Sequence, residues 1–383
     1  MIDQRPHIPI LQNRVWPNRS AARAAPLGEL DMALCTACGF AWNRAFDTDR
    51  MTYDPEYDND QMGSPAFGIH VEAMIDRVLA NVPADKTTHL VEVGCGQGAF
   101  LTKLALTDRF ASLTGFDPAF RGDDGARING VTIHKNLFGT EALDLLTHPV
   151  QVVVSRHTIE HILHPLSFLG TIRSAMQTTP EACLYLETPD IEWILDKFQP
   201  QDLFYEHCSI FSREALRTAC STAGFEVRSL MPVFGDQYLW AEARPAGEMK
   251  DIAVKPSFAA AAGTFRSKRA HFINVWRLLI TRLAAEKTVW IWGASSKGVT
   301  FALLVDPDGE RLGGAIDINP NKVDRFMPVT GLPIRGPEAV GDGDVVIVMN
   351  SNYRKEIAAQ IDAQNISVCL MTLDDIPSPE LPA

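Results

Sequence analysis

The stretch Leu90-Val-Glu-Val-Gly-Cys-Gly-Gln-Gly98 decides the fold of this chain. An apolar run from His89 to Val93 is followed by three glycines at alternate positions, and then by Ala99–Leu106, which has the composition of a helix. Glycine accepts positive φ angles and leaves open space beside the backbone because it has no Cβ. The stretch therefore predicts a buried strand, a tight loop and a helix whose positive N-terminal end faces the loop.

Further elements of the same kind surround this unit. An amphipathic helix is expected from Phe67 to Val82, and segments long enough for helices separate three β-like runs: Leu113–Phe116, Val150–Ser155 and Cys183–Glu187. This alternation predicts a parallel, doubly wound α/β sheet. The runs Glu226–Pro232 and Gln237–Ala243 are predicted to close the sheet as an antiparallel hairpin.

A second strand, loop and helix unit lies near the C-terminus. A long helix over residues 258–286 leads to the strand Thr288–Trp292 and the loop Gly293–Gly298, and Val345–Met349 supplies another strand. Asp317 lies nineteen positions after Gly298, as Asp117 lies nineteen positions after Gly98. We predict two Rossmann-like folds in series. The expected domains are a small irregular lobe (1–62), a Rossmann-like core (63–245) and a second Rossmann-like domain (246–383).

Composition limits the classes of partner. A chain of 383 residues, 46% of them hydrophobic, can bury at least two cores. The net charge of −12 argues against nucleic acid or an anionic membrane surface, which both attract Lys and Arg clusters. Met1–His7 lacks the apolar core of a signal peptide, and no run approaches the ~20 apolar residues of a membrane span. We expect a soluble cytoplasmic protein with a small-molecule substrate; no sequence feature specifies an oligomeric state.

Cys35 and Cys38 are the one closely spaced pair among the seven cysteines. Their spacing is that of half a zinc knuckle, and a structural zinc site needs two further ligands. Upstream, only His7 offers an obvious ligand nitrogen. We therefore expect two buried thiols, less than one zinc per chain and no resident metal. The acidic tract from Tyr53 to Asp60 lacks the glycine and terminal glutamate of a calcium loop, so Tyr53 and Tyr57 are instead candidates for lining a substrate cleft.

The first glycine loop carries the strongest chemical signal. Its pattern, Glu92-x-Gly94-x-Gly96-x-Gly98, is tighter than the G-x-G-x-x-G of dinucleotide enzymes and is typical of loops that cradle the amino acid part of S-adenosylmethionine. Asp117, at the end of the next strand, is expected to bind the ribose hydroxyls. Glu92 is expected to contact the ammonium group through water. The other candidate cofactor contacts are Pro118, Asn136, Arg156 and His157. The alternative is a glycine turn without a ligand.

A histidine-rich segment follows the predicted strand Val150–Ser155. His157-x-x-Glu160-His161 coincides with the zinc signature of inverted zincins, in which both histidines share one helix face. A metalloprotease would leave the glycine loop and the strand order unexplained. We therefore interpret this segment as the loop beneath the sulfonium of the cofactor.

The second glycine loop departs from a dinucleotide fingerprint. Ser295 replaces the middle glycine, which lets the backbone approach a pyrophosphate. NAD binding, and with it an oxidoreductase, is therefore not expected. The loop serves either a structural domain or part of a substrate nucleotide site, with Lys297 and Asn350 as candidate substrate contacts.

Leu203–Ser212 places Glu206 and His207 next to each other among aromatic residues. A histidine oriented by a carboxylate can abstract a proton near neutral pH. The alternative is a buried histidine whose nitrogens bond to the backbone.

Five segments together resemble the sugar C-methyltransferases of deoxysugar biosynthesis. They are Leu34–Phe40, Glu92–Gly98, Phe204–Ser212, Trp292–Val299 and Asp317–Lys322. The resemblance spans nearly the whole chain and implies an N-terminal zinc lobe, a class I methyltransferase core and a C-terminal Rossmann-like domain. It further implies a nucleotide-linked 4-keto-6-deoxysugar, deprotonated at C3 so that the enolate attacks the sulfonium methyl.

The same resemblance implies residue roles. His207 would be the base, Glu206 its partner, and His161 with Tyr53 or Tyr57 would face the substrate. The family has a tyrosine two positions before the glutamate, where this chain has Phe204; Tyr205 is displaced by one position and is the remaining catalytic candidate. The first cysteine pair of the zinc lobe is also absent. Two alternatives remain: O- or N-methylation of a small metabolite, and a non-catalytic nucleotide-sugar-binding protein.

Overall fold

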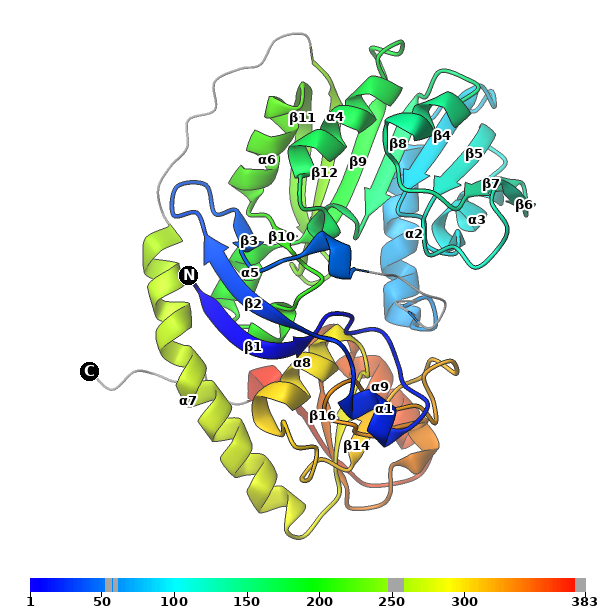
Figure 1. The fold of residues 1–383 in the computed structure, drawn as a ribbon. Helices are drawn as coiled ribbons and strands as arrows, with labels where there is room; N and C mark the ends of the chain where they lie inside the picture. The colour runs from blue at the N-terminus through cyan, green and yellow to red at the C-terminus, as the bar shows by residue number, and fades with distance from the viewer. Residues whose placement is uncertain (52–56, 58–60, 247–257, 376–383) are drawn as a thin grey trace.

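The computed structural model describes residues 1–51, 57, 61–246 and 258–375. Two large sheets lie at opposite ends of the molecule, and the strands nearest the N-terminus lie between them (Figure 1). The long helix α7 (Phe258–Ala284) runs along one side of the lower half.

The larger sheet has eight strands in the order β11-β12-β9-β8-β4-β5-β7-β6. Its five central strands are parallel, and β12 and then β11 add to one edge in antiparallel register. The predicted doubly wound sheet with a closing hairpin is confirmed. The strands are β4 (Thr88–Val93), β5 (Phe110–Phe116), β6 (Ala126–Ile128), β7 (Val131–His134), β8 (Val152–Arg156), β9 (Cys183–Pro189), β11 (Phe225–Val233) and β12 (Tyr238–Pro245).

Helices cover both faces of this sheet because each has one apolar face. In α2 (Pro65–Leu79), Phe67, Val71, Met74 and Val78 recur at helical spacing and are buried. Ser64 caps the helix by accepting the Phe67 N–H at 3.2 Å. The other helices are α3 (Ala99–Ala105), α4 (Pro165–Ala175), α5 (Ile191–Asp196) and α6 (Arg213–Thr222).

The C-terminal sheet has five parallel strands in the order β15-β14-β13-β16-β17. The strand order reverses beside β13, as it does beside β4, so both glycine loops leave a strand at a switch point. The predicted second Rossmann-like fold is confirmed. Its elements are β13 (Val289–Trp292), α8 (Ser296–Val305), β14 (Gly314–Ile316), β15 (Ile334–Arg335), β16 (Val345–Val348), α9 (Arg354–Asp362) and β17 (Cys369–Thr372).

The N-terminal region is more regular than expected. The prediction of an irregular lobe was wrong, because β1 (Asp3–Pro9), β2 (Leu27–Leu34) and β3 (Ala41–Asn43) form an antiparallel sheet completed by β10 (Ser209–Ile210). Two buried positions of β1 hold Asp3 and Arg5, so the strand lacks the alternation of apolar residues that marks most strands. Leu30 and Met32 of β2 join one apolar core with residues of α7 and the C-terminal sheet.

Short helices complete the described chain. They are α1 (Arg19–Arg23) and the 3₁₀ turns η1 (Thr48–Arg50), η2 (Thr140–Leu145), η3 (Ile159–His161), η4 (Pro200–Asp202), η5 (Pro337–Ala339), η6 (Ser351–Tyr353) and η7 (Leu373–Asp375). Within the part of the chain that the structure describes, no helix is both long and apolar enough to cross a membrane.

Arg5 provides a test of how the N-terminal sheet is held. Its buried guanidinium pairs with Asp3 at 2.9 Å and donates to the Pro200 and Leu203 carbonyls, while Arg269 of α7 pairs with Asp3 at 2.7 Å. We predict that Arg5→Met lowers the free energy of unfolding by about 3–5 kcal/mol, because it leaves buried polar groups without their partner. Urea denaturation measures this loss.

The matched control is Arg44→Met, which breaks the exposed ion pair between Arg44 and Asp31. Exposed pairs contribute little, so we expect no measurable change. Equal midpoints for the Arg5 variant and the unmodified protein would contradict the assigned role.

Candidate active site

The three glycines of the first loop face different surroundings. All three have positive φ angles. A Cβ on Gly94 would lie 1.9 Å from Thr158 Oγ1, and one on Gly98 would lie 2.6 Å from Ile133 Cδ1. A Cβ on Gly96 would meet no protein atom within 4 Å. Gly94 and Gly98 are therefore required for packing, whereas Gly96 borders open space that a ligand can fill.

Asp117 clamps this loop. One carboxylate oxygen accepts the Gly96 N–H at 2.7 Å and the other accepts the Ala119 N–H at 2.8 Å. Burial raises the pKa of Asp117, and these two N–H donors oppose that rise. Each oxygen keeps a further lone pair, so Asp117 can hold the loop and still accept hydrogen bonds from a ribose.

Two buried polar atoms beside the loop have no hydrogen-bond partner among the residues that the structure describes. Glu92 has 2% of its surface exposed, and its Oε2 makes no hydrogen bond. Burial raises the pKa of Glu92 to about 8, although Arg156 opposes the rise. Arg156 lies over the Phe100 ring and binds Glu187 at 2.6 Å through Nε, while its Nη2 is buried without a partner. The free acceptor on Glu92 fits the ammonium group of an amino acid, and the free donor on Arg156 fits its carboxylate group.

His157 follows β8 in a strained conformation. Its φ angle is +50°, which is rare for a residue with a side chain. The helix that would have placed His157 and His161 on one face is not formed, since η3 is a single 3₁₀ turn. The His157 ring lies 3.6 Å from Glu160 and 3.7 Å from Glu187. Burial would raise the pKa of Glu187, but Arg156 and His157 around it hold that pKa below its ordinary value.

The second loop repeats the clamp of the first. Asp317 accepts the Ala294 N–H at 2.9 Å with one oxygen and the Asn319 N–H at 2.9 Å with the other. A Cβ on Gly298, in the first turn of α8, would lie 1.9 Å from the Gly293 carbonyl oxygen, so this position requires glycine. The second loop is therefore built like the first, with Ser295 at the position of the middle glycine, Gly96.

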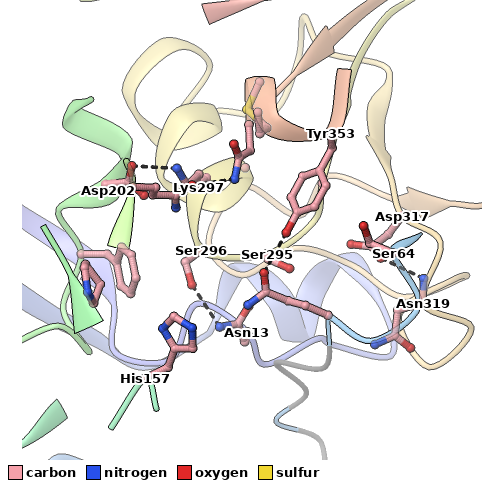
Figure 2. Close-up of a pocket in the computed structure, with 18 of the residues that line it drawn as sticks. Asn13, Ser64, His157, Asp202, Ser295, Ser296, Lys297, Asp317, Asn319 and Tyr353 are labelled. Carbon is pink, nitrogen blue, oxygen red and sulfur yellow. Dashed lines mark hydrogen bonds and ion pairs between the residues drawn. The ribbon is translucent and has the colours of Figure 1, made fainter. Parts of the chain in front are cut away.

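A cavity of about 280 Å³ lies where the three parts of the chain meet. Figure 2 shows Asn13 from the N-terminal segment, His157 from the core and Ser296 and Lys297 from the second loop around it. Asn13 donates to Ser296 at 3.0 Å, and Lys297 binds Asp202 at 2.8 Å. The predicted site residues in its lining are Tyr57, His157, His161, His207, Lys297 and Asn350.

His207 and His161 form one corner of the cavity. Their ring centroids are 4.9 Å apart, and the Phe204 ring lies 3.9 Å from His207. Burial and the neighbouring His161 lower the pKa of His207 well below its ordinary value, and burial also lowers the pKa of His161. His207 Nδ1 is buried and makes no hydrogen bond within the described part of the chain. The structure thus supplies a neutral imidazole to the cavity wall.

Glu206 bonds to the N-terminal segment and not to His207, the predicted partner. Its fully buried carboxylate accepts the Gln12 N–H at 2.6 Å. Burial raises its pKa to about 7, while hydrogen bonds from Tyr57, Gln12 and Asn13 oppose the rise. Among the described residues, no hydrogen bond joins this carboxylate to His207. Glu206 anchors the N-terminal segment over the cavity.

Other predicted residues lie outside the cavity. Tyr205 is buried in the N-terminal core, where its hydroxyl accepts the Asp47 N–H at 2.9 Å. Pro118 and Asn136 are exposed on the loops that follow β5 and β7. Tyr53 lies outside the described residues.

Several cavity residues carried no sequence signal. Asp202 lies four positions before Glu206 and binds Lys297, whose ammonium lies 4.9 Å from the centre of the Trp193 ring. Ser295 of the cavity lining accepts a hydrogen bond at 2.9 Å from Lys322, which is buried behind the lining. Asn350, which was predicted, donates to Gln237 at 2.9 Å. Only Asp202 could have been suspected, because an acidic residue stands close to the proposed base.

Cys35 and Cys38 are half-buried rather than buried. Hydrogen bonds from the Cys38 and Ala37 backbone lower the pKa of Cys35, and burial raises that of Cys38. The described residues bring no third ligand side chain to this pair. The absence of zinc stays a prediction.

Two family matches cover most of the chain. Residues 67–230 match a family described as a methyltransferase domain, and residues 243–367 match one described as a C-methyltransferase C-terminal domain. The protein is an S-adenosylmethionine-dependent methyltransferase. S-adenosylmethionine is its cofactor, and the open Gly96 surface with the unpartnered Glu92 and Arg156 atoms fits it.

Solved structures similar to this methyltransferase align over part of the chain. An N,N-8-amino-8-demethyl-D-riboflavin dimethyltransferase from Streptomyces davawensis is 19% identical over 48% of this chain and 61% of its own, with a TM-score of 0.37. Magnesium protoporphyrin IX methyltransferase from Synechocystis PCC 6803 is 16% identical over 47% of this chain and 84% of its own, with a TM-score of 0.34. No curated protein sequence matches significantly.

Gly96 provides the test of the cofactor site. We predict that Gly96→Asn stays folded, because asparagine tolerates positive φ angles and a Cβ at this position meets no protein atom within 4 Å. The side chain would fill the space left for the cofactor. S-adenosylmethionine at a hundredfold excess over its Kd should stabilise the unmodified methyltransferase by about 2.7 kcal/mol and should not stabilise the variant.

Thermal unfolding with and without S-adenosylmethionine measures both effects. Gly139→Asn, at another glycine with open space around it, is the control and should keep the ligand shift. A normal shift in the Gly96 variant would place the cofactor elsewhere.

Proposed function

We propose that this enzyme methylates carbon on a nucleotide-linked 4-keto-6-deoxysugar, with His207 as the base. The carbon that receives the methyl group is C3, next to the ketone. Its hydrogen is acidic because the electron pair left behind spreads onto the ketone oxygen. The observation that carries the proposal is the neutral His207 imidazole on the wall of a cavity between the two Rossmann-like parts.

The electrostatics of His207 support a base. A base needs a free lone pair, and the lowered pKa keeps the ring unprotonated at neutral pH. Phe204 and His161 hold the ring from two sides, which limits its rotation. In the reaction, His207 takes the C3 proton, the enolate carbon takes the methyl group, and S-adenosylhomocysteine leaves. The proton on His207 then passes to solvent.

The C-terminal half supports carbon as the acceptor atom. It matches a family described as a C-methyltransferase C-terminal domain, and its loop contributes Ser295, Ser296 and Lys297 to the cavity. Lys297 offers a cation near the start of α8, and helix N-termini favour anions. We infer that this end of the cavity receives the diphosphate of the nucleotide and that the sugar extends towards His207.

His207→Ala tests the base. We predict that it binds S-adenosylmethionine normally and loses ~10²- to 10⁴-fold in turnover, the usual contribution of a positioned base. His148→Ala, at an exposed histidine away from the cavity, is the control. In deuterated water the unmodified enzyme should exchange the C3 proton of a nucleotide-linked 4-keto-6-deoxysugar, and the His207 variant should not; mass spectrometry measures this exchange.

The pH dependence adds a second readout. Because burial lowers the pKa of His207, the neutral base persists as the pH falls. Loss of turnover through its protonation should therefore begin only below about pH 6.5, the ordinary histidine pKa. Unchanged turnover in His207→Ala would place the base elsewhere. A product methylated on oxygen or nitrogen would replace carbon methylation with the alternative reaction.

Glu206→Gln distinguishes anchoring from orientation of the base. Glutamine keeps the size of the side chain but removes the charge that receives the Gln12 N–H. Since Asn13 lines the cavity, we predict a KM for the acceptor about tenfold higher, equivalent to ~1.4 kcal/mol, with kcat within about twofold. Steady-state kinetics measure both constants. A fall in kcat at unchanged KM would instead support direct action on His207.

A further inference from the structure

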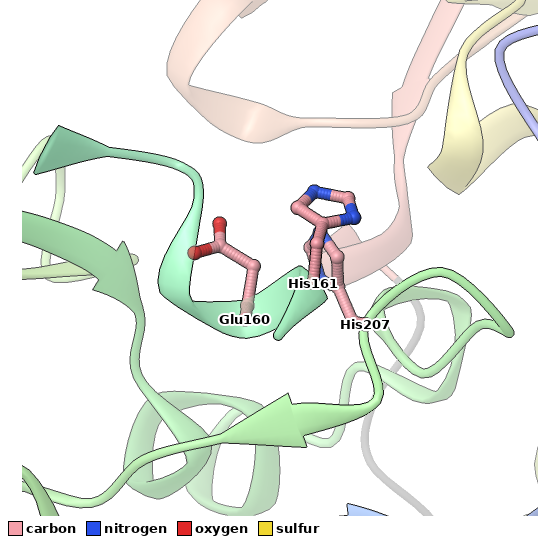
Figure 3. Close-up of side chains that lie close together, drawn as sticks. All are labelled: Glu160, His161 and His207. Atoms are coloured by element: carbon pink, nitrogen blue, oxygen red, sulfur yellow. The ribbon is translucent and has the colours of Figure 1, made fainter. Parts of the chain in front are cut away.

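Three side chains that can bind a metal converge at one corner of the cavity. Glu160, His161 and His207 each offer one ligand atom, and these atoms all lie within 4.8 Å of one another (Figure 3). Glu160 and His161 belong to the turn η3 after β8, and His207 lies just before β10. The set differs from the sequence motif of inverted zincins, because His157 is replaced by a residue forty-six positions beyond His161.

The Glu160 carboxylate is buried and half satisfied. It has no exposed surface, and its Oε2 accepts from the Thr188 hydroxyl at 3.1 Å, whereas its Oε1 makes no hydrogen bond with any residue that the structure describes. The His157 Nδ1 atom lies 3.6 Å from that oxygen. A buried carboxylate oxygen without a hydrogen bond is costly unless a positive charge reaches it. Thr188 fixes the orientation of the carboxylate, as the outer partners of metal ligands do.

His161 and His207 also have features expected of metal ligands. His161 donates one ring N–H to the Glu206 backbone carbonyl, so its second nitrogen keeps a lone pair. Metal-binding histidines usually make such a bond with the nitrogen that faces away from the metal. His207 has a buried Nδ1 without a hydrogen bond. The low pKa values of both rings, caused mainly by burial, agree with neutral imidazoles.

We propose that Glu160, His161 and His207 bind a divalent transition-metal ion of the zinc class, and that this ion inhibits methyl transfer. Two imidazoles and one carboxylate form a ligand set found in zinc sites with an open position. Imidazole ligands favour Zn²⁺, Co²⁺, Ni²⁺ and Cu²⁺ over Mg²⁺ and Ca²⁺. The fourth position faces the cavity, where water would complete the coordination.

Inhibition rests on the proposed function. The His207 ring must give a lone pair either to the metal or to the C3 proton. Occupation of the site therefore removes the base, and it also places a cation beside the acceptor pocket. Binding of the metal itself does not depend on the reaction, so the two parts can be tested separately.

Cobalt binding tests the site without an activity assay. Chelator-treated protein is titrated with Co²⁺, and we expect one ion per chain with a visible d–d spectrum and no thiolate charge-transfer band. His161→Gln and Glu160→Gln should each weaken binding by at least about tenfold. Cys35→Ser/Cys38→Ser and His148→Gln are the controls and should bind as the unmodified protein does. A normal thermal shift with S-adenosylmethionine shows that each variant is folded.

The outcomes test the metal site and its inhibitory effect separately. Absence of Co²⁺ binding, binding lost only in the cysteine variant, or binding unchanged in folded His161→Gln overturns the site. If the site binds metal, Zn²⁺ should suppress turnover and C3 exchange together, and chelator should restore both. Full turnover at saturating Zn²⁺ overturns inhibition. Persisting exchange in His207→Ala, with metal binding lost, refutes the base and leaves the metal site standing.

Discussion

The hydrogen bond from the Gln12 N–H to the Glu206 carboxylate joins parts of the chain that lie almost two hundred residues apart. It brings the N-terminal segment onto the loop that carries His207. The next residue, Asn13, bonds to Ser296 of the C-terminal half, and Asp202 of the same loop pairs with Lys297. Buried polar networks of this kind specify one arrangement, because a partly satisfied network is costly. The cavity exists because these three contacts meet.

The first and second glycine loops are held in the same way, by an aspartate that accepts a backbone N–H of the loop. A glycine loop that leaves a strand at a switch point exposes backbone N–H groups, and a buried acid from the next strand accepts one of them. Asp117 does this for Gly96, and Asp317 does it for Ala294. The equal spacing of loop and acid in the sequence reflects the same path through strand, loop, helix and strand. The difference lies at Gly96 and Ser295, which leave different amounts of room for a ligand.

Sequence reasoning found the elements whose patterns are local. The glycine loops, the central strands and the closing hairpin have short-range signals, and the structure contains them. The N-terminal sheet was missed because Asp3 and Arg5 occupy buried positions of β1. An apolar pattern cannot reveal a strand that is held by an internal ion pair.

Site residues could be predicted where a local sequence motif marks them. Contacts between residues that are distant in the sequence could not be predicted. His161 and His207 could be selected from motifs, and the structure brings them together. Tyr205 lies two positions before His207 in sequence, yet its ring packs against Gly28 and Phe46. The chain turns at Tyr205 and Glu206, so nearness in sequence alone cannot assign a role. The partners of Glu206 were unpredictable because they come from the other end of the chain.

Burial shifts the pKa values of Glu92, beside the first glycine loop, and of His207, in the cavity wall, in opposite directions. At the cofactor end, burial raises the pKa of Glu92 to about 8, so the empty site favours the protonated acid at neutral pH. An arriving ammonium favours the carboxylate, so cofactor binding and loss of this proton are linked, and binding strengthens as the pH rises towards 8. In the cavity, burial lowers the pKa of His207, so the proposed base is neutral at neutral pH. Burial thus favours the uncharged form of both groups: Glu92 is protonated until a cation binds, and His207 is unprotonated.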